Sequence, residues 1–264
     1  MSDIKLYITP VPIGNLKDIT LRAIEILKKV DFIIVEDTKY SLKLLNHLDI
    51  KKPLISYYKP KEQIKTAGII KKLKRESAAL ITDSGTPVIS DPGYYLIRAA
   101  IDNDIEIESL PGPTAFVPAL TLSGIDFSSF TFLGFPPRKT GDLTKFLTEY
   151  ANVPEALVFY QSPRRVEKFL YLAYSIFGER QFAIIKELTK KNENILRGNL
   201  KDLAHILSKT KLLGEFVIII EGQKKPVKST IKIESIQDIY SHFKKEHNIS
   251  KNIIKDIFMK RKDI

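Results

Sequence analysis

The segment AALITDSGTPVISDPGYYLIRAAIDNDIEIESL (78–110) decides the fold class. It begins with a short apolar run (78–82) and passes through a turn rich in Gly and Pro. It then follows a helical pattern over 92–102, opened by Pro92, and ends in a second β-rich run (105–110). Strand–helix–strand order is typical of a parallel sheet, because neighbouring parallel strands need a crossover connection. The segment therefore predicts part of an α/β domain.

The same alternation continues toward the N-terminus. The expected strands there are 4–11, 32–36 and 54–58, and the expected helices are 21–30 and 61–75. The first helix has an apolar face made of Leu21, Ile24, Leu27 and Val30. The pattern predicts an N-terminal α/β lobe, residues 1–112, with a largely parallel sheet covered on both faces.

A second series of strands follows a joint rich in Pro and Gly, LPGPTAF (110–116). The expected strands are 131–135, 157–160, 182–188 and 214–222, and the expected helices are 163–177 and 200–208. The β-like stretch KKNENILRGN (190–199) favours a more mixed sheet in this lobe, residues 113–222. Residues 223–264 read as a linker and two short amphipathic helices, 235–246 and 250–261, with Ser250 as an N-cap.

Composition excludes several classes of protein. No apolar run approaches the roughly 20 residues that cross a bilayer, and the N-terminus lacks a secretion signal, so we expect a cytoplasmic protein that does not enter a membrane. The sequence has no cysteine, and its 4 histidines lack metal-ligand spacing. We therefore expect no metal.

The charge favours a polyanionic partner. The net charge is +11, and residues 224–264 alone hold 11 Lys or Arg against 5 acids. Such a basic tail fits contact with an RNA backbone, although a simply solvated face explains it almost equally well.

ITDSGTPVISDPG (81–93) is the most informative candidate for a ligand site. Ligands of open α/β sheets bind outside strand ends. Asp83 could accept hydrogen bonds from an ammonium or ribose group, Gly85 would let the backbone approach a ligand, and Thr86 offers a hydroxyl. The alternative is two consecutive turns, since Asp, Ser, Gly and Pro are common turn formers.

Two further segments also follow strand ends. In LPGPTA (110–115), Thr114 lies near a helix start whose N–H groups could receive a carboxylate, or it caps that helix. ITPVPIGNLKDIT (8–20) has a Gly-containing turn but lacks the glycine patterns of nucleotide-phosphate loops. In the second lobe, basic residues beside strand ends could bind phosphate or only face solvent: Arg164, Arg165, Lys190 and Arg197.

Eight segments in order carry a family resemblance that extends over about residues 4–222. They are VPIGNLKDIT (11–20), VEDTKYSLKLLNH (35–47), TDSGTPVISDPGY (82–94), LPGPTA (110–115), LGFPPRK (133–139), FYQSPRR (159–165), ELTKKNENILRG (187–198) and GEFVIIIEG (214–222). Together they resemble the tetrapyrrole (corrin/porphyrin) methylase family, and within it the bacterial branch that methylates a cytidine ribose 2′-hydroxyl in 16S, the small-subunit ribosomal RNA. ISKNIIKDIF (249–258) is similar to the helical module of that branch.

The resemblance implies a two-lobed homodimer with S-adenosyl-L-methionine in a cleft between the lobes. The implied cofactor contacts are Ile13, Asp83, Ser84, Gly85, Thr86, Ile89, Thr114, Ala115, Tyr160 and Gln161. The implied contacts to ribosomal RNA or the small ribosomal subunit are Lys39, Arg138, Lys139, Arg164, Arg165, Lys190 and Arg197.

The sequence departs from the branch's pattern at four of these positions. Ser84 replaces Ala, Lys39 replaces Arg, and Gln161 and Arg164 stand where the branch has Glu and His. Gln161 cannot serve as an ionised base, and Lys39 gives up bidentate phosphate geometry.

Methylation of a ribose hydroxyl needs an acceptor for its proton, so a carboxylate near the site is expected. The candidates are Glu36, Asp37 and Glu187. The acids of EDT (36–38) could instead cap the helix that follows them. Two other functions stay open: a methyltransferase of the same fold acting on a tetrapyrrole or another small molecule, and a non-catalytic RNA-binding assembly factor.

Overall fold

The computed structural model describes residues 4–208 and 211–224. They form two compact units. The first contains the chain up to Val117 together with Thr189–Lys191, and the second contains Pro118–Leu188 and the described residues from Asn192 on. The expected helices at 235–246 and 250–261 lie outside the described residues.

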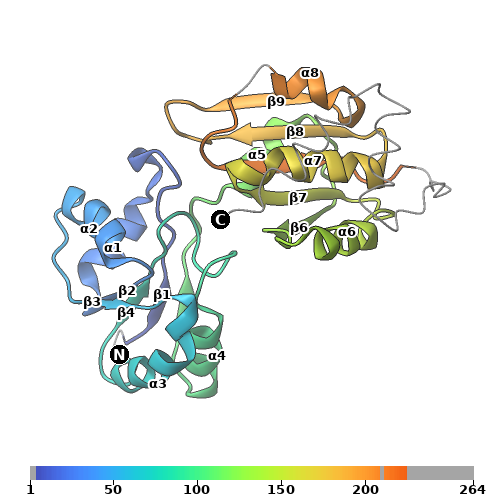
Figure 1. The fold of residues 1–264 in the computed structure, drawn as a ribbon. Helices are drawn as coiled ribbons and strands as arrows, with labels where there is room; N and C mark the ends of the chain where they lie inside the picture. The colour runs from blue at the N-terminus through green and yellow to red at the C-terminus, as the bar shows by residue number, and fades with distance from the viewer. Residues whose placement is uncertain (1–3, 209–210, 225–264) are drawn as a thin grey trace. The chain divides into compact units, whose positions relative to one another are not determined.

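The first unit is built on a five-stranded parallel sheet with strand order β3-β2-β4-β1-β5 (Figure 1). Its strands are β1 (Leu6–Ile8), β2 (Phe32–Val35), β3 (Leu54–Ser56), β4 (Ala78–Leu80) and β5 (Ile107–Ser109). Every neighbouring pair runs parallel. This confirms the parallel α/β lobe that the alternating pattern predicts.

Helices cover both faces of this sheet (Figure 1). Leu6 and Ile8 pack with α3 (Glu62–Leu73) and α4 (Tyr94–Asp102), whereas Tyr7 packs with α1 (Leu21–Lys29) and α2 (Thr38–His47). Successive strand residues point to opposite faces, so two covered faces require the continuous apolar runs seen in the sequence.

Two expectations for this unit are wrong in detail. Leu21 is 79% exposed although it was assigned to the apolar face of α1. At about 100° per residue it points roughly 120° away from the buried Leu27, and Ala23 takes the inward position instead. Helix α4 begins at Tyr94 rather than at Pro92, with Gly93 as its N-cap residue at φ +137°.

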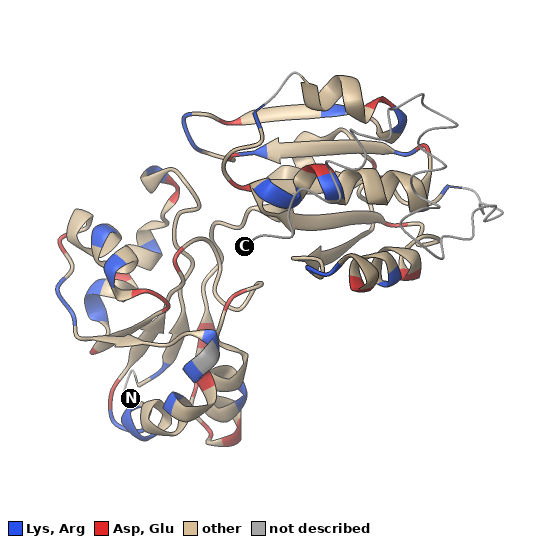
Figure 2. Cartoon of the chain, in the orientation of Figure 1, with Lys and Arg blue, Asp and Glu red and all other residues tan. Residues whose placement is uncertain are grey.

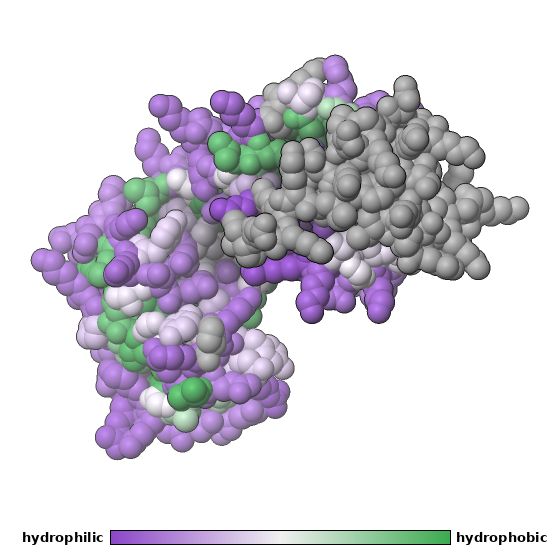
Figure 3. All heavy atoms as spheres, viewed as in Figure 1, coloured by the Kyte–Doolittle hydropathy of each residue, from purple (hydrophilic) through white to green (hydrophobic). Residues whose placement is uncertain are grey.

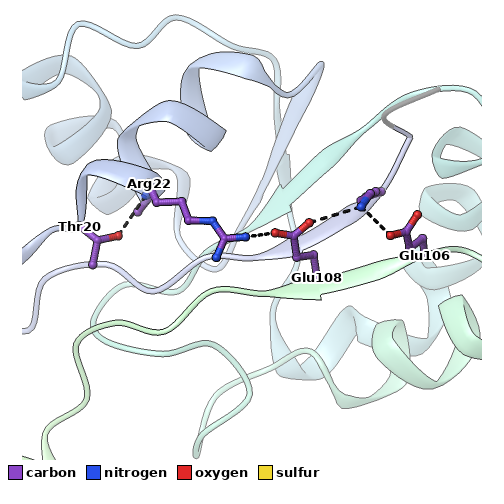
Figure 4. A network of polar contacts seen from close by, with 6 residues as sticks. Thr20, Arg22, Glu106 and Glu108 are labelled. Carbon is purple, nitrogen blue, oxygen red and sulfur yellow. Dashed lines mark hydrogen bonds and ion pairs between the residues drawn. The ribbon is translucent and has the colours of Figure 1, made fainter. Parts of the chain in front are cut away.

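Charged side chains line β5 at the edge of the first sheet (Figure 4). Glu108 pairs with Arg22 and Lys5, and Lys5 also pairs with Glu106 at 2.5 Å. Charges along an edge strand oppose pairing with another chain.

The second unit contains a mixed five-stranded sheet with strand order β6-β7-β10-β8-β9. Its strands are β6 (Phe130–Gly134), β7 (Ala156–Gln161), β8 (Gln181–Lys186), β9 (Asn194–Asn199) and β10 (Phe216–Ile220). Only β6 and β7 pair in parallel, and the other three pairs are antiparallel. This confirms the expected mixed sheet.

Three helices cover one face of the mixed sheet: α6 (Thr140–Glu149), α7 (Pro163–Phe177) and α8 (Leu203–Ser208). The expected helix 200–208 is divided into a 3₁₀ turn, η3 (Leu200–Asp202), and α8. On the opposite face, Arg197 of β9 donates to the Leu122 carbonyl of α5 (Phe116–Ser123). No helix in the described ranges is long and apolar enough to span a membrane.

Candidate active site

The motifs of the first unit meet at the carboxyl ends of its parallel strands. Val11, after β1, and Gly85, after β4, exchange two backbone hydrogen bonds of 2.9 and 3.1 Å. The Thr86 hydroxyl donates to the Pro113 carbonyl after β5 at 2.8 Å, and the Asp37 N–H after β2 donates to Asp83 Oδ1 at 3.2 Å. Four loops are therefore joined at one edge of the sheet.

A fifth motif reaches the same edge from far along the sequence. The Asn15 N–H donates to the hydroxyl of Thr189, in ELTK, at 3.1 Å. Thr189–Lys191 accordingly belongs to the first unit. These two motifs are 174 residues apart in the chain and adjacent in the fold.

Gly85 has a specific packing role at this junction. Its φ of +80° lies in the left-handed region, and a Cβ there would lie 3.2 Å from Ile13 Cγ2 and 3.6 Å from the Pro113 carbonyl oxygen. Only glycine adopts this conformation without penalty. Gly85 is thus required for the contact among three loops, which the sequence interpretation had not considered.

The loop after Gly85 carries backbone strain. Val88 has φ +73° and Ser90 has φ +72°. A β-branched residue at positive φ is an outlier, and such strain is concentrated at functional sites. Lys59 holds the loop by donating to the Ser90 carbonyl at 2.9 Å.

Carboxylates gather beneath this loop. Burial raises the pKa of Asp83, with a smaller effect from Glu36 and Asp37. Burial also raises the pKa of Asp91 to about 6, and the neighbouring Thr82 side chain opposes this effect. Within the described ranges, no group of three or more His, Asp or Glu side chains is arranged to hold a metal ion.

The three candidate proton acceptors have different surroundings. Asp37 is the N-cap of α2, where its Oδ1 accepts from the N–H groups of Lys39 and Tyr40 at 2.7 and 3.2 Å, so the alternative capping interpretation is confirmed for this residue. Glu36 Oε2 accepts from the Thr82 hydroxyl at 3.0 Å. Glu187 lies in the second unit, with Oε1 accepting from the Glu215 N–H at 2.8 Å.

Other sequence-predicted cofactor residues lie in the same loops. Thr86 uses its hydroxyl on Pro113, so its donor is committed to the protein. Ser84, Thr114 and Ala115 are half-buried, and Ile89 is exposed. One buried polar atom, the Thr9 hydroxyl directly after β1, has no partner.

The motifs of the second unit also end at one edge of its sheet. Gln161 of β7 and Lys186 of β8 both lie opposite Phe216, the first residue of β10. Tyr160 packs edge-on against Phe132 and Phe135, with ring centroids 5.1 and 5.5 Å away. Gln161 is 2% exposed, and its Nε2 has no partner.

Basic residues lie at the starts of α6 and α7, which follow β6 and β7 (Figure 2). Arg138 and Lys139 are exposed, whereas Arg165 donates to the carbonyls of Pro136 and Pro137 at 2.9 and 2.6 Å. Burial, and then the charge of Arg138, lower the pKa of Arg165. Arg165 therefore holds the β6–α6 loop in addition to contributing charge.

Two further basic residues need comment. Lys168, which sequence reasoning missed, donates to the Thr140 hydroxyl at 2.6 Å, and burial followed by the charge of Arg165 lowers its pKa. Its position three residues after Arg165 could have identified it, since such residues share a helix face. Arg197 holds the end of α5 through Leu122. Of the other predicted RNA contacts, Lys39 and Arg164 are exposed and Lys190 is half-buried.

Hydrophilic residues dominate the described surface on the face shown in Figure 3, and the hydrophobic ones form small separate groups. A polar partner suits that face better than a large apolar one.

The fold and the motif loops define a class of protein, and comparison with known protein families identifies that class. Residues 5–204 match the model of the Tetrapyrrole (Corrin/Porphyrin) Methylases. The chain belongs to this family.

Relatives in this family share much of the sequence. The chain is 46% identical over 223 residues to a protein of Hydrogenobaculum sp. named ribosomal RNA small subunit methyltransferase I, an alignment that covers 83% of this chain and 96% of the relative. A protein of the same name from Streptococcus pyogenes is 39% identical, over 91% of this chain and 84% of its own. Another from Halalkalibacterium halodurans is 41% identical, over 84% of this chain and 77% of its own.

Solved structures share the fold at low sequence identity. A diphthine synthase matches with a TM-score of 0.60 at 11% identity, covering 82% of this chain and 89% of its own. A cobalt precorrin-4 methyltransferase matches with a TM-score of 0.58 at 17% identity, covering 83% and 95%. At these identities the likeness shows the fold.

Proposed function

We propose that this protein transfers a methyl group from S-adenosyl-L-methionine to the ribose 2′-hydroxyl of a cytidine in small-subunit ribosomal RNA. The observation that carries the proposal is the junction of five motif loops at one sheet edge, in a chain 46% identical to a protein named ribosomal RNA small subunit methyltransferase I. That the protein is a homodimer and that it is located in the cytoplasm remain predictions.

The residues of the first edge fit the proposed methyl donor. Asp83 offers a carboxylate to an ammonium or ribose group, and the unpartnered Thr9 hydroxyl is buried at the same strand ends. The donor supplies an activated methyl group when bound. Asp83, Ser84 and Thr114 would hold it, Ile13, Ile89 and Ala115 would make apolar contacts, and Gly85 and Thr86 would keep the loops in place. Tyr160 and Gln161 of the second unit stay predicted contacts.

Glu36 is the proton acceptor that the surroundings favour. The Thr82 hydroxyl orients its carboxylate through a hydrogen bond of 3.0 Å. Asp37 and Glu187 are less suitable, because each has a carboxylate oxygen engaged by backbone N–H groups. Glu36 would accept the proton of the 2′-hydroxyl as the oxygen attacks, and alignment of the two groups supplies the rest of the acceleration.

The basic edge of the second unit fits a phosphate backbone. Arg138 and Lys139 are exposed beside Arg165 and Lys168, whose pKa values are lowered partly by neighbouring positive charge. A concentration of like charge is relieved by a polyanion.

A labelling experiment separates the proposed function from its alternatives. The protein is incubated with methyl-labelled S-adenosylmethionine and, in parallel, purified small subunits, large subunits or uroporphyrinogen. We expect label in small-subunit RNA alone. Label in the tetrapyrrole would indicate the small-molecule enzyme, and S-adenosylmethionine binding without transfer to any substrate would contradict the proposal. A protein that binds RNA but not the methyl donor would be an assembly factor.

A further inference from the structure

A surface of tyrosines and lysines on the first unit lies outside the sheet edge where the motif loops meet. We call it the tyrosine–lysine surface, and it consists of Tyr58, Lys59, Lys61, Lys65, Tyr94 and Tyr95. The first three belong to the β3–α3 connection, which includes the 3₁₀ turn η2 (Lys59–Lys61). Lys65 lies in the first turn of α3, and the two tyrosines Tyr94 and Tyr95 begin α4. Tyr94 is 64% exposed and Tyr95 is 44% exposed. Two adjacent exposed rings are costly to leave in water and suggest a partner.

The two parts of this surface are tied together. Lys59 donates to the Ser90 carbonyl at 2.9 Å, and the buried Glu62 accepts from the Gly93 N–H at 2.6 Å. Gly93 directly precedes Tyr94, and Ser90 lies four residues before it. The rings are therefore presented by a fixed backbone, which lowers the entropic cost of binding.

The charge of this surface is positive. Lys59 and Lys61 are exposed, whereas Lys65 is half-buried and its ammonium donates to the Ser56 carbonyl. The ammonium groups of Lys61 and Lys65 lie 5.8 and 5.7 Å from the centroid of the Tyr58 ring. Glu62, the acid among them, is 6% exposed and turned toward Gly93. The Tyr58 ring beside these ammonium groups is half-buried, and the exposed rings are those of Tyr94 and Tyr95. Cations together with aromatic rings are the combination with which proteins bind single-stranded nucleic acid.

We propose that the tyrosine–lysine surface binds unpaired bases of an RNA strand on Tyr94 and Tyr95 and its phosphates with Lys59, Lys61 and Lys65. This inference rests on the proposed RNA substrate. The two rings are 5.6 Å apart with planes at 72°, so their faces point in different directions. A regular stacked helix cannot follow both faces, whereas splayed bases of a loop or bulge can.

The position of the surface agrees with such a role. One loop runs from Asp83, at the proposed methyl-donor site, to Gly93, at the start of α4, and passes through the strained Val88 and Ser90. A strand held on Tyr94 would be held next to the loop proposed to hold the methyl donor. The surface would thus select unpaired RNA near the target nucleotide.

The first test measures binding of a single-stranded RNA oligonucleotide and of the matching duplex by fluorescence anisotropy. The double variant Tyr94→Ala/Tyr95→Ala should raise the Kd for the single strand about 5- to 100-fold and leave the duplex Kd within about twofold. The control Tyr94→Phe/Tyr95→Phe keeps both ring faces and should bind like the wild type. Equal loss of both RNAs, or loss in the Phe variant, would overturn stacking.

The second test concerns the lysines. Lys61→Ala/Lys65→Ala should weaken single-strand binding and reduce the log–log salt slope by about 0.7 for each lost contact. Lys71→Ala/Lys74→Ala, exposed at the far end of α3, is the matched control and should change neither.

Three additional readouts separate the possible failures. S-adenosylmethionine affinity and melting temperature should stay unchanged in every variant, which excludes a folding defect. Normal oligonucleotide binding together with no methylation of ribosomal RNA would refute the proposed function while leaving this surface intact. A Tyr94→Ala/Tyr95→Ala protein that changes mass by light scattering with unaltered RNA affinity would show that a second copy of the chain, and not RNA, covers the surface.

Discussion

In each sheet the sequence motifs lie at one edge, and these two edges differ in charge and in backbone conformation. The first edge carries the carboxylates Glu36, Asp37, Asp83 and Asp91 around glycine- and proline-rich loops with strained residues. The second edge carries exposed and half-buried cations at the starts of α6 and α7, next to the aromatic cluster of Tyr160. Carboxylates and strain suit proton transfer and cofactor binding, whereas cations suit a phosphate backbone.

This comparison separates two kinds of defect. Changes at the first edge should lower kcat or cofactor affinity, and changes at the second should weaken RNA binding in a salt-dependent way.

Glu36→Gln should produce the largest effect. Removing a proton acceptor costs about 10²–10⁴-fold in rate, so kcat should fall about 100-fold or more while the Kd for S-adenosylmethionine stays near the wild-type value. The matched control is Asp37→Asn, because Asn caps a helix as well as Asp does. Activity lost in Asp37→Asn and retained in Glu36→Gln would transfer the role to Asp37.

Gly85→Ala should weaken cofactor binding about tenfold. A Cβ at φ +80° costs about 1–2 kcal/mol and also contacts Ile13 Cγ2 at 3.2 Å, so the loop junction must shift. Gly68→Ala is the control, because a Cβ there meets nothing within 4 Å and a helix favours Ala. Calorimetry that gives the same affinity for Gly85→Ala and wild type would contradict the role of the junction.

Arg138→Ala/Lys139→Ala should weaken RNA binding without changing cofactor affinity. Each lost phosphate contact should reduce the slope of log Kd against log salt by about 0.7 for single-stranded RNA. The exposed Lys28→Ala on the first unit serves as control. A double variant with the wild-type salt slope would remove the second edge from the RNA contact.

Asp91→Asn should have the smallest effect, and this effect is on the stability of the fold. The folded-state pKa is about 6 against an ordinary value of 3.8, so the folded protein binds the proton more tightly and the contribution of Asp91 to stability declines as pH rises from about 4 to 6. Asp91 is partly solvated, so we discount the free-energy cost of ionising it in the folded protein to about 1 kcal/mol. Asp91→Asn removes this cost and should melt roughly 2–4 °C higher than the wild type above pH 6. The two proteins should melt together near pH 4, and a variant less stable at pH 7 would contradict the burial penalty.

The sequence contained enough information to predict where the strands of both sheets lie. Each expected strand is found, because strands buried on both faces need continuous apolar runs, such as FIIV (32–35) in the parallel sheet and VIII (217–220) in the mixed sheet. Helix α6 was not predicted, since its N-cap Lys139 makes no side-chain cap bond and Gly141 lies in its first turn. Local signals for its start are weak.

The site was predictable as a set of loops but not in the roles of its residues. Motif order and family resemblance predict Asp83, Gly85 and Thr114 as cofactor contacts. The structure was needed to show that Thr86 joins two loops and that Arg165 holds a third, because those hydrogen bonds connect residues 27 to 29 positions apart through tertiary packing. Sequence spacing carries no signal for such contacts.

The central claim is tested most directly by mass spectrometry of small-subunit ribosomal RNA from cells that lack this protein, complemented with the wild type or with Glu36→Gln. The proposed function predicts that one 2′-O-methylcytidine disappears without the protein, returns with the wild type and does not return with Glu36→Gln. RNA whose 2′-O-methylated nucleosides are identical in all these cells would contradict it.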